Sequence, residues 1–134
     1  MVKFVVDTTS WSIYFRRKTL SEKEKNVWSS LDYLISAEKS VMLGAVRQEL
    51  LSGISDKVCF DKLKQKIQIF EDYIPQTSDY ELAAEFSNIC RKNGIQGSTT
   101  DYLICAVAAK NNWVIFSQDG DFQNYKKLLP VKVL

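Results

Sequence analysis

The amino-acid sequence predicts an α/β fold, namely a three-layer α/β/α sandwich with a short parallel central sheet. The first observation is that short apolar runs alternate along the chain with longer segments whose apolar residues recur at helical spacing. The second is that these runs are rich in β-branched residues and lack polar alternation, as is typical of parallel strands covered on both faces. The third is the length of 134 residues, with 46% hydrophobic and 25% charged residues. This composition indicates one domain spanning residues 1–134.

The first half of the chain contains two clear strands and three helices. Apolar, β-branched runs predict buried strands at residues 2–6 and 40–43. Apolar residues at helical spacing predict helices over residues 22–38, 45–51 and 58–73. Pro75 then breaks the chain, and the segment before it has room for a short strand near residues 73–74.

The second half begins with two longer helices. The first is expected to be capped by Ser78 or Asp79, and the second, ending near Lys110, by Thr99 or Thr100. The second helix is apolar nearly all round, so we expect it at the centre of the molecule. The remaining elements are strands at residues 113–116 and 131–134 and a short helix between them.

Several function classes are excluded by what the sequence lacks. It contains no histidine, which removes Ser-His-Asp and Cys-His catalysis and histidine-ligated zinc. It contains neither GxGxxG nor GxxxxGK[ST], so the usual dinucleotide and P-loop phosphate cradles are missing. An enzyme with this sequence must therefore work with carboxylates, hydroxyls, lysine or arginine.

A cytoplasmic location is the expectation from the sequence. No apolar run approaches the roughly 18 residues that a membrane span needs, and the first residues lack the features of a signal peptide. The three cysteines form no CxxC pair. Cys90 and Cys105 stand among apolar residues and are interpreted as buried free thiols of a reducing compartment.

Charge alone does not identify a nucleic-acid-binding protein here. The net charge is only +2, which is too small to indicate a polyanionic partner without further support. Local basic clusters occur at residues 16–18, at Lys62, Lys64 and Lys66, and at residues 91–92. Each is equally consistent with a contact to nucleic acid or with a solvated surface.

Acidic residues stand where buried segments end or begin, which makes them candidates for one shared site. Asp7 follows the first strand, Glu49 lies on the helix after the second, and Asp101 opens the central helix. Asp119 and Asp121 follow the strand at residues 113–116. Because parallel sheets bind ligands outside the carboxyl ends of their strands, these acids are expected to converge at one end of the sheet.

Each of these acids also has a purely structural interpretation. Asp7 could cap the helix that follows it, and Asp101 could accept from the first-turn amides of its own helix. Asp119 with Gly120 could form a turn, and Glu49 could be one exposed charge among many.

Taken as a set, the acids indicate a metal site. Carboxylates packed together repel one another and lose hydration, which raises their pKa values and costs stability unless a cation compensates. Mg²⁺ and Mn²⁺ take hard oxygen ligands, keep several waters and bridge phosphate oxygens. Such ions suit phosphodiester hydrolysis, in which they generate hydroxide and neutralise developing charge.

Four sequence blocks, in this order and at this spacing, carry a family resemblance. They are Asp-Thr-Thr at residues 7–9, Glu-Leu-Leu-Ser-Gly at 49–53, Asp-Tyr-Leu-Ile-Cys-Ala-Val-Ala at 101–108, and Val-Ile-Phe-Ser-Gln-Asp-Gly-Asp-Phe at 114–122. Together they resemble the PIN domain, in particular the VapC-like toxins of bacterial and archaeal toxin–antitoxin pairs. The resemblance covers essentially the whole chain and implies the PIN-like form of the α/β/α sandwich.

The resemblance also implies roles for individual residues. It assigns metal-binding or water-activating roles to the acids Asp7, Glu49, Asp101, and Asp119 or Asp121. Family members differ in which of the last two positions is acidic, and here both are, so that choice stays open. Thr9 and Ser117 match small hydroxyl positions near the site, the second being more often threonine in the family.

By the same resemblance, the expected activity is Mg²⁺- or Mn²⁺-dependent endoribonuclease cleavage of RNA. A homodimer and a cognate antitoxin that blocks the acidic groove are also implied. The aromatic stretch at residues 11–15 and Trp28 could supply an apolar surface for either contact, or could be ordinary core residues.

The same residues bear on several other protein classes. A haloacid-dehalogenase-like phosphatase needs a second aspartate two residues after Asp7, where this chain has Thr9. A receiver domain would need an acidic pair near the first strand, which is not convincing here. A catalytically silent PIN-like interaction module and an RNA-processing PIN nuclease without an antitoxin remain as alternatives.

Overall fold

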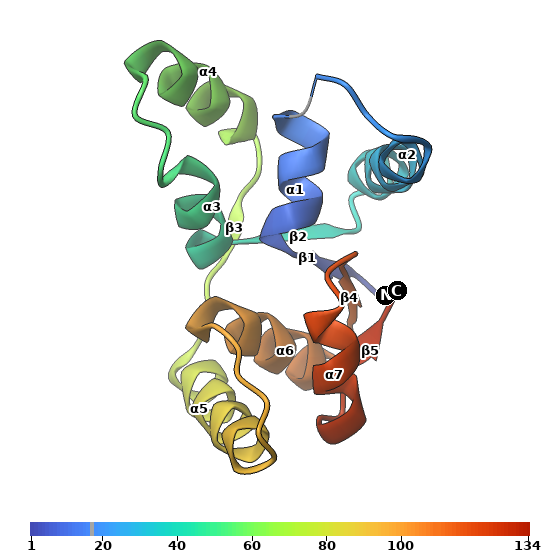
Figure 1. Cartoon of the computed structure of the whole chain (residues 1–134), viewed down its shortest axis with the longest axis vertical. Coiled ribbons are helices and arrows are strands. Elements are labelled where there is room, and N and C mark those ends of the chain that lie inside the picture. The colour runs from blue at the N-terminus through green and yellow to red at the C-terminus, as the bar shows by residue number, and fades with distance from the viewer. Residues whose placement is uncertain (17) are drawn as a thin grey trace.

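The computed structural model describes residues 1–16 and 18–134, which form a five-stranded parallel sheet flanked by helices (Figure 1). The strand order is β3-β2-β1-β4-β5, and all four neighbouring pairs are parallel. The strands are β1 (Phe4–Val6), β2 (Ser40–Leu43), β3 (Asp72–Tyr73), β4 (Val114–Phe116) and β5 (Lys132–Val133). The predicted α/β/α fold is confirmed.

Helices form the two outer layers. They are α1 (Thr8–Phe15), α2 (Glu22–Ser36), α3 (Gly44–Leu51), α4 (Lys57–Ile67), α5 (Thr77–Lys92), α6 (Thr99–Asn111) and α7 (Asp121–Leu128). In Figure 1, α1 to α4 lie above the strands and α5 to α7 lie below them. The two chain ends, marked N and C, lie close together on the right.

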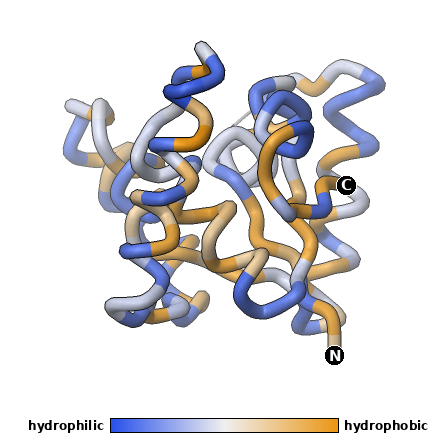
Figure 2. Tube along the Cα trace, turned by 90° about the horizontal axis from the view of Figure 1, so that it is seen from below, coloured by the Kyte–Doolittle hydropathy of each residue, from blue (hydrophilic) through white to orange (hydrophobic). Residues whose placement is uncertain are grey.

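Helix α6 lies at the centre of the core, as its apolar sequence predicts. Seven consecutive residues, 102–108, are buried, and the helix packs against α5, β1 and β4. Seven consecutive residues make about two helical turns and therefore point to every side of the helix, so all of them are buried only if the helix is enclosed on all sides. Figure 2 shows hydrophobic segments through the middle of the molecule and hydrophilic ones at its periphery.

Two helix starts differ from their predicted positions. Helix α5 begins after Gln76, and Asp79 in its first turn reaches back to accept from the Gln76 amide at 2.8 Å. The predicted cap at Ser78 or Asp79 is therefore wrong. Helix α6 is capped by Ser98, whose Oγ accepts from the Asp101 amide at 3.0 Å, and not by either threonine that follows.

Helix α4 ends six residues earlier than its predicted end at residue 73. The guanidinium of Arg47 donates to the carbonyl oxygens of Ile67, at 2.9 Å, and Phe70, and it pairs with Asp72 at 2.9 Å. These bonds hold carbonyls that a continuing helix would use itself, so the chain leaves the helix and enters β3 at residues 72–73.

Within the described residues, no helix is long and apolar enough to cross a membrane. Cys90 and Cys105 are buried free thiols, as predicted, and Cys59 is free and exposed. Trp11 is fully buried in the core, whereas Trp28 is 38% exposed and stacks on Tyr14. The core interpretation therefore holds for Trp11, and Trp28 contributes to the surface.

Candidate active site

The carboxyl ends of the two central strands bring Asp7 and Ser117 together. Strands β1 and β4 pair in parallel with Val6 opposite Phe116, so the residues that follow them are neighbours at one edge of the sheet. The Asp7 amide donates to the Phe116 carbonyl at 3.2 Å, and Ser117 Oγ donates to Asp7 Oδ2 at 2.6 Å. Both side chains are buried.

Asp7 has both a structural contact and an unfavourable charge. Its Oδ1 accepts from the Ser10 amide at 3.0 Å, so it caps α1 as the structural interpretation expected. Burial raises the pKa of the Asp7 carboxyl, against the effect of hydrogen bonds from Ser10 and Ser117. The negative charge of Asp119 raises the same pKa further. Capping of α1 therefore does not explain why a second negative charge, that of Asp119, lies near this buried carboxylate.

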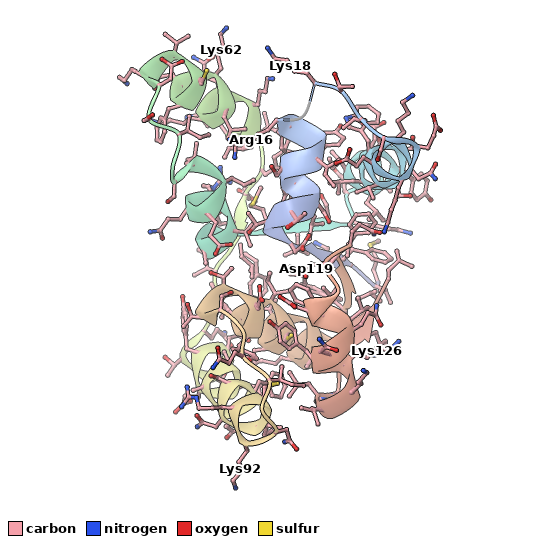
Figure 3. All side chains as sticks on the ribbon, in the orientation of Figure 1. Arg16, Lys18, Lys62, Lys92, Asp119 and Lys126 are labelled. Atoms are coloured by element: carbon pink, nitrogen blue, oxygen red, sulfur yellow. The ribbon has the colours of Figure 1, made fainter. Side chains whose placement is uncertain are left out.

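The loop after β4 places Asp119 beside this pair. The Asp119 amide donates to Ser117 Oγ at 3.0 Å, and Asp119 Oδ1 accepts from the Asp121 amide at 3.0 Å. This is the predicted turn chemistry, and it fixes the loop in front of the sheet edge. Figure 3 shows Asp119 between the lower end of α1 and α7. Asp119 is half-buried, whereas Asp121 is exposed at the start of α7.

Asp101 comes to the same region from the first turn of α6. Burial raises the pKa of its carboxyl, and the charges of Asp119 and Asp121 raise it further. Since the charge of Asp119 acts on both Asp7 and Asp101, these three carboxylates share one electrostatic environment. Asp7 and Asp101 are 94 positions apart in sequence, and the charge of Asp119 acts on both of them.

Glu49 is more loosely connected to this group. It is exposed on α3, and its Oε1 accepts a hydrogen bond from the Thr8 hydroxyl, next to Asp7. Thr9, the hydroxyl that the sequence singled out, is exposed. Among residues 1–16 and 18–134, Thr8 makes a hydroxyl contact to an acid and Thr9 makes none.

A buried tyrosine that the sequence analysis missed completes the site. Tyr125 Oη donates to Asp101 Oδ2 at 2.6 Å, and the side chain of Tyr125 is fully buried. Burial raises the pKa of this phenol, and the hydrogen bond to Asp101 and the nearby negative charges raise it further. Tyr125 therefore stays protonated at neutral pH and remains a donor. Its only sequence signal is a position one helical turn after Asp121.

The donor set suits a hard divalent cation. All the candidate ligands are carboxylate or hydroxyl oxygens, and two of the carboxyl groups have pKa values raised by burial and by a neighbouring negative charge. In the part of the chain that the structure describes, no three carboxylate or cysteine side chains are close enough to hold an ion alone. This fits Mg²⁺, which binds through one or two carboxylates together with waters and phosphate oxygens.

Basic side chains from two predicted clusters meet at the far end of α1. A hollow there has an apolar floor that includes Phe15 and Leu63, and its rim carries four cations: Arg16, Lys18, Lys62 and Lys66. Figure 3 shows Arg16 and Lys18 at the end of α1 opposite Asp119, and Lys62 on α4. The eight residues of α1 separate this hollow from Asp7 by about 12 Å. Arg17, between two of these cations in sequence, lies outside the described residues.

Comparison with known proteins places this arrangement in context. The PIN domain family matches residues 4–128. The fold is similar to that of FitAcB from Neisseria gonorrhoeae, with a TM-score of 0.76, 17% identity, and coverage of 98% of this chain and 96% of that one. It is also similar to VapBC2 from Rickettsia felis bound to a promoter DNA fragment, with a TM-score of 0.71, 14% identity, and coverage of 100% and 98%. DNA-bound VapBC from Salmonella typhimurium has a TM-score of 0.70 at 14% identity, with coverage of 100% and 98%. No curated protein matches the sequence.

Proposed function

The chain belongs to the PIN domain family, and from this premise we propose that it is a Mg²⁺- or Mn²⁺-dependent endoribonuclease whose domain spans residues 1–134. The observation that carries the proposal is the hydrogen-bonded group of Asp7, Ser117 and Asp119 at the carboxyl end of the central strands, with Asp101 close enough to be affected by the charge of Asp119. Ligand sites of parallel sheets lie at this end. Carboxylates such as Asp7 and Asp101, whose pKa values are raised by burial and by a neighbouring negative charge, gain stability from a bound divalent cation.

The proposed roles follow from how each side chain is held. Asp7, Asp101 and Asp119 are the candidate ligands; one or two of them would bind the cation directly and the others through water, with Asp121 nearby at the start of α7. When bound, the ion supplies a lowered pKa for attacking water and neutralises charge on the phosphate. Ser117 fixes Asp7 through its 2.6 Å hydrogen bond. Asp119 is favoured over Asp121 as the fourth family acid because its charge acts on both Asp7 and Asp101.

Glu49 and Thr9 complete the proposed set. Glu49 is exposed, so it is free to accept a proton from water, while its contact with Thr8 ties it to the start of α1. Thr9, exposed one residue farther on, is available to substrate. The basic hollow about 12 Å away along α1 supports a polyanionic substrate, because four cations line it.

We also propose that the chain is the toxin of a toxin–antitoxin pair in the cytoplasm. Solved structures of similar fold are the FitAcB and VapBC complexes. Trp28, stacked on Tyr14, and Tyr33 on α2 expose aromatic surface suited to an antitoxin or to a second copy in a homodimer. Buried free thiols agree with a reducing compartment.

RNA cleavage by the purified chain tests this function. We expect cutting with Mg²⁺ or Mn²⁺, none with EDTA, and a loss of at least about 100-fold in Asp101→Asn, since a missing ligand removes both ion affinity and orientation. The control is Glu85→Gln, which changes an exposed acid of α5 outside the proposed site. This variant should cut RNA normally. Absence of cutting in every metal would favour the catalytically silent interaction module. Cutting without a co-encoded antitoxin would favour an RNA-processing nuclease.

A further inference from the structure

The carboxyl group of Asp101 is held by a buried tyrosine of α7. One oxygen of Asp101, Oδ2, is taken by a 2.6 Å hydrogen bond from a buried phenol. The amide of Asp101 is separately held by Ser98 Oγ at 3.0 Å. Both the backbone and one carboxylate oxygen are therefore fixed, and the Ser98 hydroxyl also acts on this carboxyl group and lowers its pKa.

The phenol itself is held from several sides. Its ring packs against Tyr102 at 5.3 Å and against Phe122 at 5.3 Å, the second in an edge-on arrangement. Moving the Tyr125 ring out of this position would lose both ring contacts. Because the Tyr125 side chain is packed on these sides, its hydroxyl has a defined position.

Gly97, in the loop before α6, makes room for this hydroxyl. A Cβ atom at Gly97 would lie 2.4 Å from Tyr125 Oη and 2.9 Å from the Tyr102 hydroxyl oxygen. Such distances are too short for nonbonded atoms, so any larger residue would displace the phenol. The backbone of Gly97 needs no left-handed conformation, and space is what requires glycine here.

We propose that Tyr125 is a positioning residue that holds Asp101 Oδ2, so that Asp101 presents Oδ1 to a divalent cation, and that Gly97 preserves the space this requires. The proposal rests on the proposed function, because it assumes that Asp101 binds a metal ion. It adds a residue from α7 and a loop glycine to a site otherwise built from acids. Partners that orient a ligand side chain typically change metal affinity by 10- to 100-fold when they are removed.

A purely structural role is the competing explanation. In that case the hydrogen bond only ties α7 to α6, and its loss changes the stability of the protein and leaves its metal affinity unchanged. Metal affinity measured without RNA therefore separates the two roles, because a stability change in a protein that stays folded does not alter the ligand geometry.

The experiment is calorimetric titration of the full chain with Mn²⁺ alone, using wild type, Tyr125→Phe and Tyr102→Phe. Tyr125→Phe keeps the ring and removes the donor, and we expect about 10-fold weaker Mn²⁺ binding. The control Tyr102→Phe removes a hydroxyl from the same aromatic cluster and should stay within about 2-fold of wild type. With RNA, Tyr125→Phe should lower kcat while leaving KM for RNA unchanged, because the substrate is not contacted.

Gly97→Ala keeps the donor but displaces it, and it serves if Tyr125→Phe does not fold. Weakened Mn²⁺ binding in a folded Gly97→Ala supports the proposal, and wild-type affinity in either folded variant overturns it. If wild type itself binds no Mn²⁺, the proposed function fails together with the positioning role. Mn²⁺ binding by wild type that Tyr125→Phe retains in full contradicts the positioning role alone.

Discussion

Two buried aspartates at helix starts lie in opposite electrostatic settings. Asp79, in the first turn of α5, is fully buried and has Lys110 Nζ 3.3 Å from its Oδ1. Asp7, at the start of α1, is 3% exposed and is held by uncharged donors. The charged residue that affects the Asp7 pKa is Asp119, which is also negative. Among residues 1–16 and 18–134, no lysine or arginine pairs with Asp7.

The difference teaches what each carboxylate is for. Burying a charge without a partner is costly, so the fold neutralises Asp79 with a lysine from α6. The tyrosine hydroxyl of Tyr73, 3.5 Å from Asp79 Oδ2, and the Gln76 amide add to that closed network. Asp7 is nearly as buried and pairs with no lysine within the described residues, and a bound cation is the compensation that we propose for it. Asp79 ties two helices together, whereas for Asp7 we propose a place in a binding site.

The largest expected effect is on the compensated member. Asp79→Asn leaves Lys110 without its counter-ion and should lower the free energy of unfolding by about 2 kcal/mol. This value allows for the side chain of Lys110 being 32% exposed, so that its charge still reaches water. Thermal unfolding should show a fall of roughly 8 °C. The control is Asp61→Asn in the exposed pair with Lys57, which should change stability by less than about 0.5 kcal/mol.

An unchanged melting temperature for Asp79→Asn would break the comparison, because the ion pair would then contribute nothing to the fold. A fall of equal size in Asp61→Asn would show that the effect does not depend on burial.

A smaller effect of opposite sign is expected for Asp7→Asn. The amide oxygen of asparagine still accepts from the Ser10 amide, while the buried negative charge is removed. In metal-free buffer at pH 7 we expect a gain of about 1 kcal/mol, or about 3 to 5 °C in melting temperature. A clear loss of stability would instead mean that capping by the ionised carboxylate dominates at this position.

The pH dependence supplies the control for that prediction. The pKa of Asp7 in the folded state is raised above its ordinary value of 3.8. Between the unfolded-state pKa and this raised folded-state pKa, the folded state binds more protons than the unfolded state. Wild-type stability therefore falls as pH rises through this window, and Asp7→Asn lacks that contribution. The stabilisation by Asp7→Asn should shrink as pH is lowered from 7 toward 4. A gain independent of pH would point to packing and not to charge.

Much of the fold could be predicted from the sequence because it depends on local patterns. Four of the five strands and the central position of α6 follow from apolar runs, and the short strand β3 follows from the break at Pro75. The end of α4 could not be predicted, because it depends on Arg47, which is distant in sequence and holds the carbonyls of Ile67 and Phe70. The start of α6 at Ser98 depends on which of three neighbouring hydroxyl residues meets the free amides.

The sequence pointed to the acids and to Ser117, which contacts Asp7, but not to the tyrosine that contacts Asp101. Asp7 and Asp101 are marked by their places beside buried segments and by the family resemblance. Tyr125 carries no such mark, because a tyrosine on an amphipathic helix is indistinguishable in sequence from an ordinary core residue. Its role depends on a 2.6 Å contact between α6 and α7, and on Gly97, whose space requirement appears only in three dimensions.

The carboxylates at the sheet edge have no cationic side chain paired with them in the described residues, and we propose that a bound divalent ion neutralises their charge. The most direct test of this proposal is thermal unfolding of wild type and of Asp7→Asn at pH 7, with and without Mg²⁺, at one ionic strength. At about ten times the dissociation constant, Mg²⁺ should stabilise wild type by about 1.4 kcal/mol and raise its melting temperature by several degrees. Asp7→Asn should respond much less. Equal melting temperatures of wild type with and without Mg²⁺, or equal shifts in both proteins, would contradict the account.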